Sequence, residues 1–218
     1  LRYECEPLGF NRNFTIYDSD DSHQVIKTLM NELNISTQQF KSQAIRGRIS
    51  MAKNQMISPS EFKMQTENLF DEKVALVFEE YQHRLQKSNA MDFDDLLFKM
   101  HELLRDYPEV LHKYQHKFKY LLIDEYQDTN PVQYQIAKLL AAVHENICVV
   151  GDDAQSIYSF RGATIENILQ FQKDYDDVKV VKLEQNYRST QNILNVANEV
   201  IKNNKNLKFE KSLEKLIS

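Results

Sequence analysis

The chain has 218 residues, which is enough for one large or two small domains. Hydrophobic residues make up 42% of it, an ordinary share for a globular protein, and only four Gly and four Pro predict a mostly regular, largely helical chain. The net charge of −5 argues against a self-sufficient nucleic-acid-binding domain, which is more often basic, so any contact with DNA must be local. No apolar stretch approaches the roughly 18 residues that a membrane span needs.

The two cysteines, Cys5 and Cys148, are far apart and match no metal-ligand spacing. Cys148 lies in an apolar run, which predicts a buried thiol, and the cysteine usage indicates a reducing, cytoplasmic compartment. No signal peptide is visible, and the start at Leu1 rather than Met indicates a fragment or a trimmed chain.

The first hundred or so residues predict helices. Ser36-Thr-Gln-Gln39 has the form of a capping box, and Ser58-Pro59-Ser60-Glu61 supplies a cap, a first-turn proline and a reciprocal acceptor. Asp92 is expected to open another helix. Between these starts, residues 71–89 carry apolar side chains at helical spacing, which predicts one buried stripe formed by Val74, Val77, Phe78, Tyr81 and Leu85.

A basic stretch runs from Lys41 to Lys53 and includes Arg46 and Arg48 but no acidic residue. Such a stretch is typical either of phosphate contacts or of a solvated helix face, and charge alone favours the solvated face.

The pattern changes near Phe118. Short apolar segments over residues 118–123, 146–150 and 178–183 predict strands, and they alternate with helices predicted over residues 130–143, 163–171 and 189–203. Continuous apolar strands that alternate with helices indicate a parallel sheet in an α/β domain. Such sheets place ligands at the carboxyl ends of their strands, and each predicted strand here ends in polar residues.

The first polar segment delivers two adjacent carboxylates, Asp124 and Glu125, to the end of a predicted strand. Magnesium prefers oxygen ligands and keeps several waters, so one carboxylate together with nucleotide phosphates is enough to hold it. The neighbouring carboxylate is then able to orient or deprotonate an attacking water. An Asp-Glu pair by itself is usually surface charge, and the strand before it strengthens the functional interpretation.

The second segment follows the second predicted strand. Gln155 is a neutral group able to hydrogen-bond a phosphate or a water, while Tyr158 and Phe160 are able to stack on bases and Arg161 to pair with a phosphate. Composition alone favours core aromatics and a surface arginine. In the third segment, Arg188 is a candidate arginine finger and Tyr187 a candidate for stacking on adenine.

Together the three segments are far more specific than their parts. Asp-Glu-Tyr-Gln-Asp-Thr-Asn, Gly-Asp-Asp-x-Gln-Ser-Ile-Tyr-x-Phe-Arg-Gly-Ala and Leu-Glu-Gln-Asn-Tyr-Arg-Ser-Thr resemble, in this order and spacing, motifs II, III and IV of superfamily 1 DNA helicases of the UvrD/Rep/PcrA type. Residues 91–96 (Met-Asp-Phe-Asp-Asp-Leu) and 11–14 (Asn-Arg-Asn-Phe) resemble further stretches of that group, so the resemblance covers nearly the whole chain.

The resemblance implies a role for each matched residue. Asp124 would bind Mg²⁺ through water, Glu125 would activate the hydrolytic water, and Gln155 would sense the γ-phosphate of ATP. The remaining assignments are stabilisation of the γ-phosphate charge by Arg188, adenine stacking by Tyr187, and contact with single-stranded DNA by Tyr158, Phe160 and Arg161. Many relatives have Trp where this chain has Phe160, which keeps a stacking face but loses area and the indole N–H.

No Gly-x-x-x-x-Gly-Lys-Ser/Thr loop occurs in the chain. The resemblance therefore implies a middle section of a helicase: an all-helical insertion domain over residues 1–89, then the later part of a RecA-like P-loop NTPase motor domain over residues 90–218. The parent is expected to be an ATP-dependent 3′–5′ DNA helicase that acts on single-stranded and forked DNA with repair or replication proteins, and away from membranes. The section by itself is expected to be inactive.

Two other interpretations stay open on the sequence. One is the motor part of a helicase–nuclease of the RecB/AddA kind, which a nuclease domain in the parent would decide. The other is a non-enzymatic module that binds DNA or a protein partner.

Overall fold

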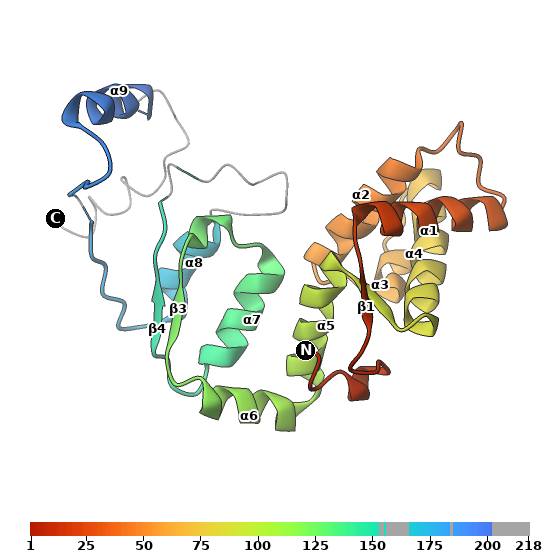
Figure 1. The fold of residues 1–218 in the computed structure, drawn as a ribbon, viewed down its shortest axis with the longest axis horizontal. Coiled ribbons are helices and arrows are strands. Elements are labelled where there is room, and N and C mark those ends of the chain that lie inside the picture. Colours follow the sequence, from red (N-terminus) through yellow and green to blue (C-terminus); the bar gives the residue numbers. More distant parts are fainter. Residues whose placement is uncertain (153–154, 156–165, 184, 202–218) are drawn as a thin grey trace. The chain divides into compact units, whose positions relative to one another are not determined.

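The computed structural model describes residues 1–152, 155, 166–183 and 185–201 (Figure 1). Its internal contacts divide the chain into two compact units. Unit 1 comprises Leu1–Leu121 and Asn130–Ile147, and unit 2 comprises Leu122–Thr129 and Cys148–Ser218. Within the described ranges, no helix has the length and apolar character needed to cross a membrane.

Helices dominate unit 1. The α-helices of this unit are α1 (Ser19–Glu32), α2 (Ser42–Asn54), α3 (Pro59–Met64), α4 (Leu69–Lys87), α5 (Phe93–Asp106), α6 (Pro108–Lys117) and α7 (Pro131–Ala141). The other elements among the described residues are η1 (Glu6–Leu8), β1 (Thr15–Tyr17), β2 (Ala90–Asp92), β3 (Leu121–Ile123), η2 (Tyr126–Asp128), β4 (Ile147–Val149), α8 (Glu166–Asp174) and α9 (Gln191–Ile201).

Capping residues start several helices where the sequence predicts. Ser58, Asp92 and Asn130 each accept a hydrogen bond from the backbone N–H three residues later, and in each case that residue's side chain bonds back to the cap. These boxes satisfy backbone donors that a helix leaves unpaired at its first turn. The predicted starts of α3, α5 and α7 are therefore confirmed, whereas Ser36 begins only a turn, because α2 starts later, at Ser42.

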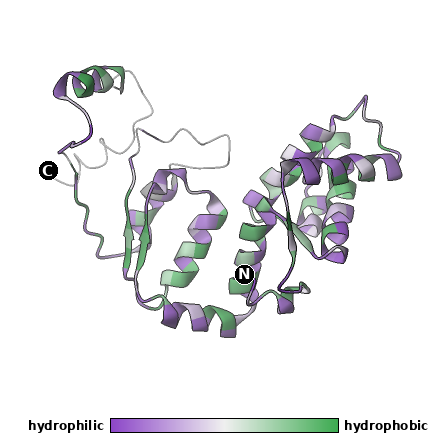
Figure 2. Ribbon diagram, viewed as in Figure 1, coloured by the Kyte–Doolittle hydropathy of each residue, from purple (hydrophilic) through white to green (hydrophobic). Residues whose placement is uncertain are grey.

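The main core lies among α1, α2, α3 and α4. Hydrophobic and hydrophilic residues are interleaved along these helices, so that one side of each is free to pack inward (Figure 2). The predicted stripe of α4 is confirmed, since all five of its side chains belong to the buried core together with Ile26, Leu29, Met30, Ile45 and Ile49.

Two short strands bracket this helical segment. β1 pairs with β2 in parallel, with Thr15 opposite Ala90 and Tyr17 opposite Asp92. A second cluster of buried side chains packs beside this pair and consists of Cys5, Phe10, Phe14 and Met91. The helices α1–α4 are thus inserted between two strands that lie side by side, so that both ends of the insertion meet at one place.

β3 pairs with β4. The amide of Leu121 donates to the carbonyl of Asn146 at 2.9 Å, and the amide of Val150 donates to the carbonyl of Ile123 at 2.8 Å. This hydrogen-bond pattern is typical of parallel strands. The predicted class, an α/β fold with short parallel strands, is confirmed. Because parallel strands end at the same edge, Asp124 and Gly151 emerge together from the sheet.

Two expectations about the apolar segments are wrong. Residues 178–183 form no strand, and Val181 and Leu183 are exposed. Cys148, predicted to be a buried thiol, is exposed in β4. Both errors have one cause. An apolar run becomes a buried strand only where other segments pair with it and cover its faces. In the described part of the chain, the sheet formed by β3 and β4 has only these two strands.

Candidate nucleotide-hydrolysis site

Asp124 and Glu125 follow β3 and are exposed. The Asp124 Oδ1 atom accepts a hydrogen bond from the Glu125 amide at 2.9 Å. Glu125 itself adopts the left-handed conformation, with φ 51° and ψ 42°, which costs a non-glycine residue free energy. The turn directs the chain into η2, whose first residue, Tyr126, is buried.

Gln127 connects the two carboxyl ends of the strands. It is 1% exposed. Its Nε2 donates to Glu125 Oε2 at 2.7 Å, and its Oε1 accepts from the Asp152 amide at 3.0 Å. One buried amide therefore holds both the Glu125 carboxylate and the backbone that follows β4. Sequence reasoning missed Gln127, and its place within the Asp-Glu-Tyr-Gln-Asp-Thr-Asn segment was the only signal for it.

Gln155 lies on the same turn. Its amide donates to the Asp152 carbonyl at 3.1 Å, and its Nε2 donates to Asp152 Oδ2 at 2.6 Å. The structure thus brings Glu125 and Gln155, two residues selected from the sequence, into one hydrogen-bonded series through Gln127 and Asp152.

Packing in unit 2 supports the turn after Glu125. Tyr126 packs edge-on against Phe171 of α8, with ring centroids 5.8 Å apart. Asn167, also on α8, donates through Nδ2 to the Thr129 carbonyl at 2.9 Å. Burial raises the pKa of the Tyr126 phenol, which therefore stays neutral at physiological pH.

Tyr187 and Arg188 are exposed on the segment that precedes α9. The Asn186 side chain accepts hydrogen bonds from the amides of Arg188 and Ser189, which fixes this turn. Among the residues that the structure describes, no hydrogen bond or ion pair joins Tyr187 or Arg188 to Asp124, Glu125 or Gln155. The other candidate residues, Tyr158, Phe160 and Arg161, lie outside the described ranges.

Asp124 fits the chemistry of a magnesium ligand. One of its carboxylate oxygens is bonded to the Glu125 amide, and the exposed side chain has a second oxygen to offer. Mg²⁺ is commonly held by one or two carboxylates, substrate phosphates and several waters. The described part of the chain contains no group of three His, Cys, Asp or Glu side chains placed to hold a metal ion.

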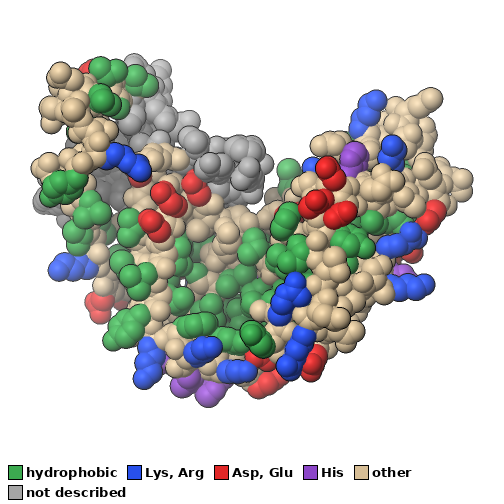
Figure 3. Space-filling model, viewed as in Figure 1, with side chains coloured by type: hydrophobic (Ala, Val, Ile, Leu, Met, Phe, Trp, Pro, Cys, Tyr) green, Lys and Arg blue, Asp and Glu red, His purple; other side chains and the backbone are tan. Residues whose placement is uncertain are grey.

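The basic stretch of unit 1 is used within the protein. Lys53 is fully buried and its Nζ lies 2.7 Å from Asp92 and 2.9 Å from Asp95. Arg48 pairs with Asp71 at 3.1 Å, and Arg46 donates to the Ser19 carbonyl. The favoured interpretation, a solvated face, is therefore wrong for Lys53. On the face drawn in Figure 3, lysine and arginine side chains are dispersed among acidic ones.

Lys53, Asp92 and Asp95 form a buried charged cluster in which burial and the neighbouring charges shift the pKa values. Burial raises the pKa of Asp95 to about 6. Burial by itself lowers the pKa of the Lys53 ammonium, but the adjacent carboxylates of Asp95 and Asp92 raise it above its ordinary value. Tyr81 adds a hydrogen bond from its hydroxyl to Asp92 at 2.9 Å. This network joins α2, α4 and α5, and its acidic members come from the 91–96 segment, to which sequence reasoning assigned no role.

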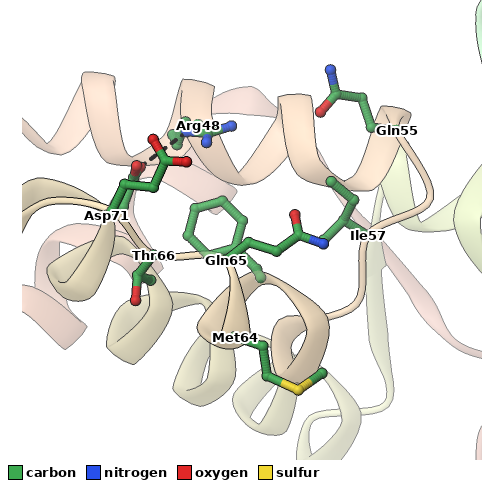
Figure 4. A pocket seen from close by; sticks show the side chains of 9 residues that line it. Arg48, Gln55, Ile57, Met64, Gln65, Thr66 and Asp71 are labelled. Atoms are coloured by element: carbon green, nitrogen blue, oxygen red, sulfur yellow. Dashed lines mark hydrogen bonds and ion pairs between the residues drawn. The ribbon is translucent and has the colours of Figure 1, made fainter.

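A pocket of about 480 Å³ opens among α2, α3 and the start of α4 (Figure 4). Arg48 lines it, paired with Asp71 and lying over the Phe62 ring at 4.9 Å from its centroid. It contains none of the candidate hydrolysis residues.

Comparison with known families decides the classification. Residues 1–176 match the sequence model of the UvrD/REP helicase N-terminal domain. This chain belongs to the UvrD/REP helicase family. Residues 181–217 match the UvrD-like helicase C-terminal domain, so the segment with Tyr187 and Arg188 falls under the second model.

Several curated proteins of this UvrD/REP family are similar over nearly the whole chain. The ATP-dependent DNA helicase PcrA of Bacillus subtilis (strain 168) is 49% identical over 208 residues, which is 95% of this chain and 28% of that protein. PcrA of Staphylococcus aureus (strain Mu50) is 48% identical over 204 residues, and PcrA of Staphylococcus epidermidis is 47% identical over the same length. The chain spans 28% of the length of these relatives.

Proposed function

We propose that this chain is a section of an ATP-dependent DNA helicase that translocates 3′ to 5′ on single-stranded DNA and unwinds forked duplexes. The observation that carries the proposal is the series from Glu125 through Gln127 and Asp152 to Gln155, which joins two family motifs at the carboxyl end of a parallel sheet. The similarity to proteins named ATP-dependent DNA helicase PcrA supports it. A cytoplasmic place and partners in DNA repair or replication belong to the same proposal.

The proposed chemistry divides between neighbouring carboxylates. Glu125 accepts a proton from the attacking water, because its carboxylate is exposed on one side and held by Gln127 on the other. Asp124 and the phosphates of ATP hold Mg²⁺, which supplies charge neutralisation when bound. Gln155 senses the γ-phosphate, and its hydrogen bond to Asp152 connects it to the turn after β4.

Residues from the other segments complete the proposal. Arg188 stabilises charge on the transferred phosphate and Tyr187 stacks on adenine; both are exposed and therefore open to a ligand. Tyr158, Phe160 and Arg161 contact single-stranded DNA.

We further propose the domain division at residue 89, with a helical insertion before it and motor-domain sequence after it. The parallel pairing of β1 with β2 supports an insertion with adjoining ends, whose body runs from residue 18 to residue 88. The family match that begins at residue 181 favours a further boundary just before the segment that holds Tyr187 and Arg188.

The test uses Glu125→Gln in the full-length helicase that contains this segment. Glutamine keeps the size of the side chain but cannot take up a proton, so DNA-stimulated ATP turnover should fall by about 10²-fold or more. Binding of a fluorescent Mg²⁺–nucleotide should be retained, since Asp124 is unchanged. The matched control is Glu145→Gln, because Glu145 is also exposed and also has a φ of 51°. Turnover that survives Glu125→Gln contradicts the proposal.

A further inference from the structure

The carboxylate of Glu125 has one observed restraint. It is exposed and sits on a left-handed turn, and within the described residues its only side-chain hydrogen bond comes from Gln127. A solvent-exposed glutamate without that bond would sample several rotamers. The geometry required for proton transfer, a heavy-atom distance of about 3 Å to the water, would then be populated only part of the time.

The orientation of the Gln127 amide is fixed by its surroundings. The Asp152 amide is a donor, so the atom that faces it at 3.0 Å must be the carbonyl oxygen of Gln127. Its NH₂ group therefore faces the Glu125 carboxylate at 2.7 Å. The side chain is 1% exposed, which leaves it no room to exchange these partners for water.

We infer that Gln127 is a positioning residue for ATP hydrolysis: its amide holds the Glu125 carboxylate in a fixed position relative to the turn formed by Asp152 and Gln155. The inference rests on the proposed role of Glu125 as the base. Gln127 itself need not touch the substrate. It acts by keeping the base in one place, in the geometry that proton transfer requires.

The test is Gln127→Glu in the full-length helicase, because glutamate has the same shape and keeps an acceptor for the Asp152 amide. The donor toward Glu125 is lost, so the bond that is 2.7 Å long in the wild type cannot form, and the exposed Glu125 side chain then samples other rotamers.

The expected signature is a fall in kcat without a matching change in KM. The kcat for ATP should fall by about tenfold or more, because the Glu125 carboxylate occupies its productive position for a smaller part of the time. The KM for ATP should stay within about threefold, since the phosphate contacts are untouched. A variant with wild-type kcat, or one whose KM rises as much as its kcat falls, overturns the inference.

Gln115→Glu is the matched control. Gln115 is also buried and also donates through Nε2, in this case to the Leu139 carbonyl at 2.8 Å. It reports the effect of a buried glutamate that is not bonded to Glu125, and its kcat should stay within about twofold of the wild-type value. If Gln127→Glu does not fold, as judged by circular dichroism, Gln127→Leu decides: a fall in kcat with KM retained supports the inference, and wild-type kcat overturns it.

Glu125→Gln belongs in the same series. If it retains turnover, the assignment of the base fails, and with it the proposed function of this site. If it is inactive while Gln127→Glu has the wild-type kcat, the positioning role fails alone.

Discussion

Asn130 donates a hydrogen bond through Nδ2 to Asn54 Oδ1 at 2.7 Å, although 76 positions separate them. Asn54 is the last residue of α2, and its own amide donates to Asp94 Oδ1 at 3.0 Å. Asn130 caps α7 and ends the segment that contains Asp124 and Glu125. The bond therefore ties the inserted helices to the residue at which the acidic segment enters its helix.

Replacement of Asn54 by alanine should destabilise the chain by about 1–3 kcal/mol, because the buried Asn130 amide loses its acceptor. Urea denaturation followed by circular dichroism measures the change. Asn146→Ala is the control, since that amide makes an exposed bond to the Lys119 carbonyl and should change stability by less than about 0.5 kcal/mol. Equal effects at both positions would contradict the importance of the Asn54–Asn130 bond.

Lys53→Met should cost about 3–5 kcal/mol at pH 8, because it leaves the buried carboxylates of Asp92 and Asp95 facing each other without a cation. The exposed pair of Lys63 with Glu79 supplies the control, and Lys63→Met should cost less than about 1 kcal/mol. Chemical denaturation at matched pH gives both values.

The Lys53→Met defect should shrink as pH falls from 8 to 5. In the wild type, the pKa of Asp95 is raised from 3.8 to about 6, so the folded state binds this proton more tightly than the unfolded chain. That contribution to stability is present at acid pH and is lost as pH rises through about 6. Without the ammonium, both carboxyls take up protons more readily, and protonation removes their repulsion. A defect of constant size between pH 5 and pH 8 would argue against buried charge as its cause.

Glu125→Gly and Glu145→Gly form a matched pair, since both residues have a φ of 51°. Glycine relieves the left-handed strain but gains freedom in the unfolded chain, so Glu145→Gly should change stability by about 0–1 kcal/mol in the favourable direction. Glu125→Gly should be less stable than this by about 1–3 kcal/mol, because the buried Gln127 amide loses its acceptor. Equal stability changes for the two variants, from thermal or urea denaturation, would show that the Glu125–Gln127 bond adds nothing to the stability of the fold.

The 218-residue chain by itself should release no phosphate from ATP in the presence of single-stranded DNA. It has no Gly-x-x-x-x-Gly-Lys-Ser/Thr loop, whose lysine and backbone hold the β- and γ-phosphates. A coupled phosphate assay checks this, with Glu125→Gln as the blank for contaminating activity. Turnover that disappears in the Glu125→Gln chain contradicts the prediction.

Phe160→Ala in the full-length helicase should separate coupling from chemistry. Loss of a stacking platform worth about 1–3 kcal/mol per base should weaken DNA stimulation and unwinding by about tenfold, while basal ATP turnover is spared. Phe93→Ala, at an exposed phenylalanine of α5, is the control. If Phe160→Ala lowers basal turnover as much as Glu125→Gln does, the division of roles is wrong.

The sequence by itself determined the local structure and the family. Caps at Ser58, Asp92 and Asn130 start helices because their hydrogen bonds span only three residues, and the stripe of α4 follows from helical periodicity alone. The order and spacing of three polar segments were enough to indicate a UvrD/Rep-type helicase, and the family comparison confirms it.

The tertiary structure decided everything that depends on distant partners. Lys53 is charged and lies in a basic stretch, yet it is buried, because Asp92 and Asp95, about 40 residues later, supply its counter-charge. Residues 178–183 have the apolar composition of a strand but form none, since a strand requires a neighbour to pair with. The role of Gln127 depends on an amide 25 residues away, at Asp152, which no local pattern encodes.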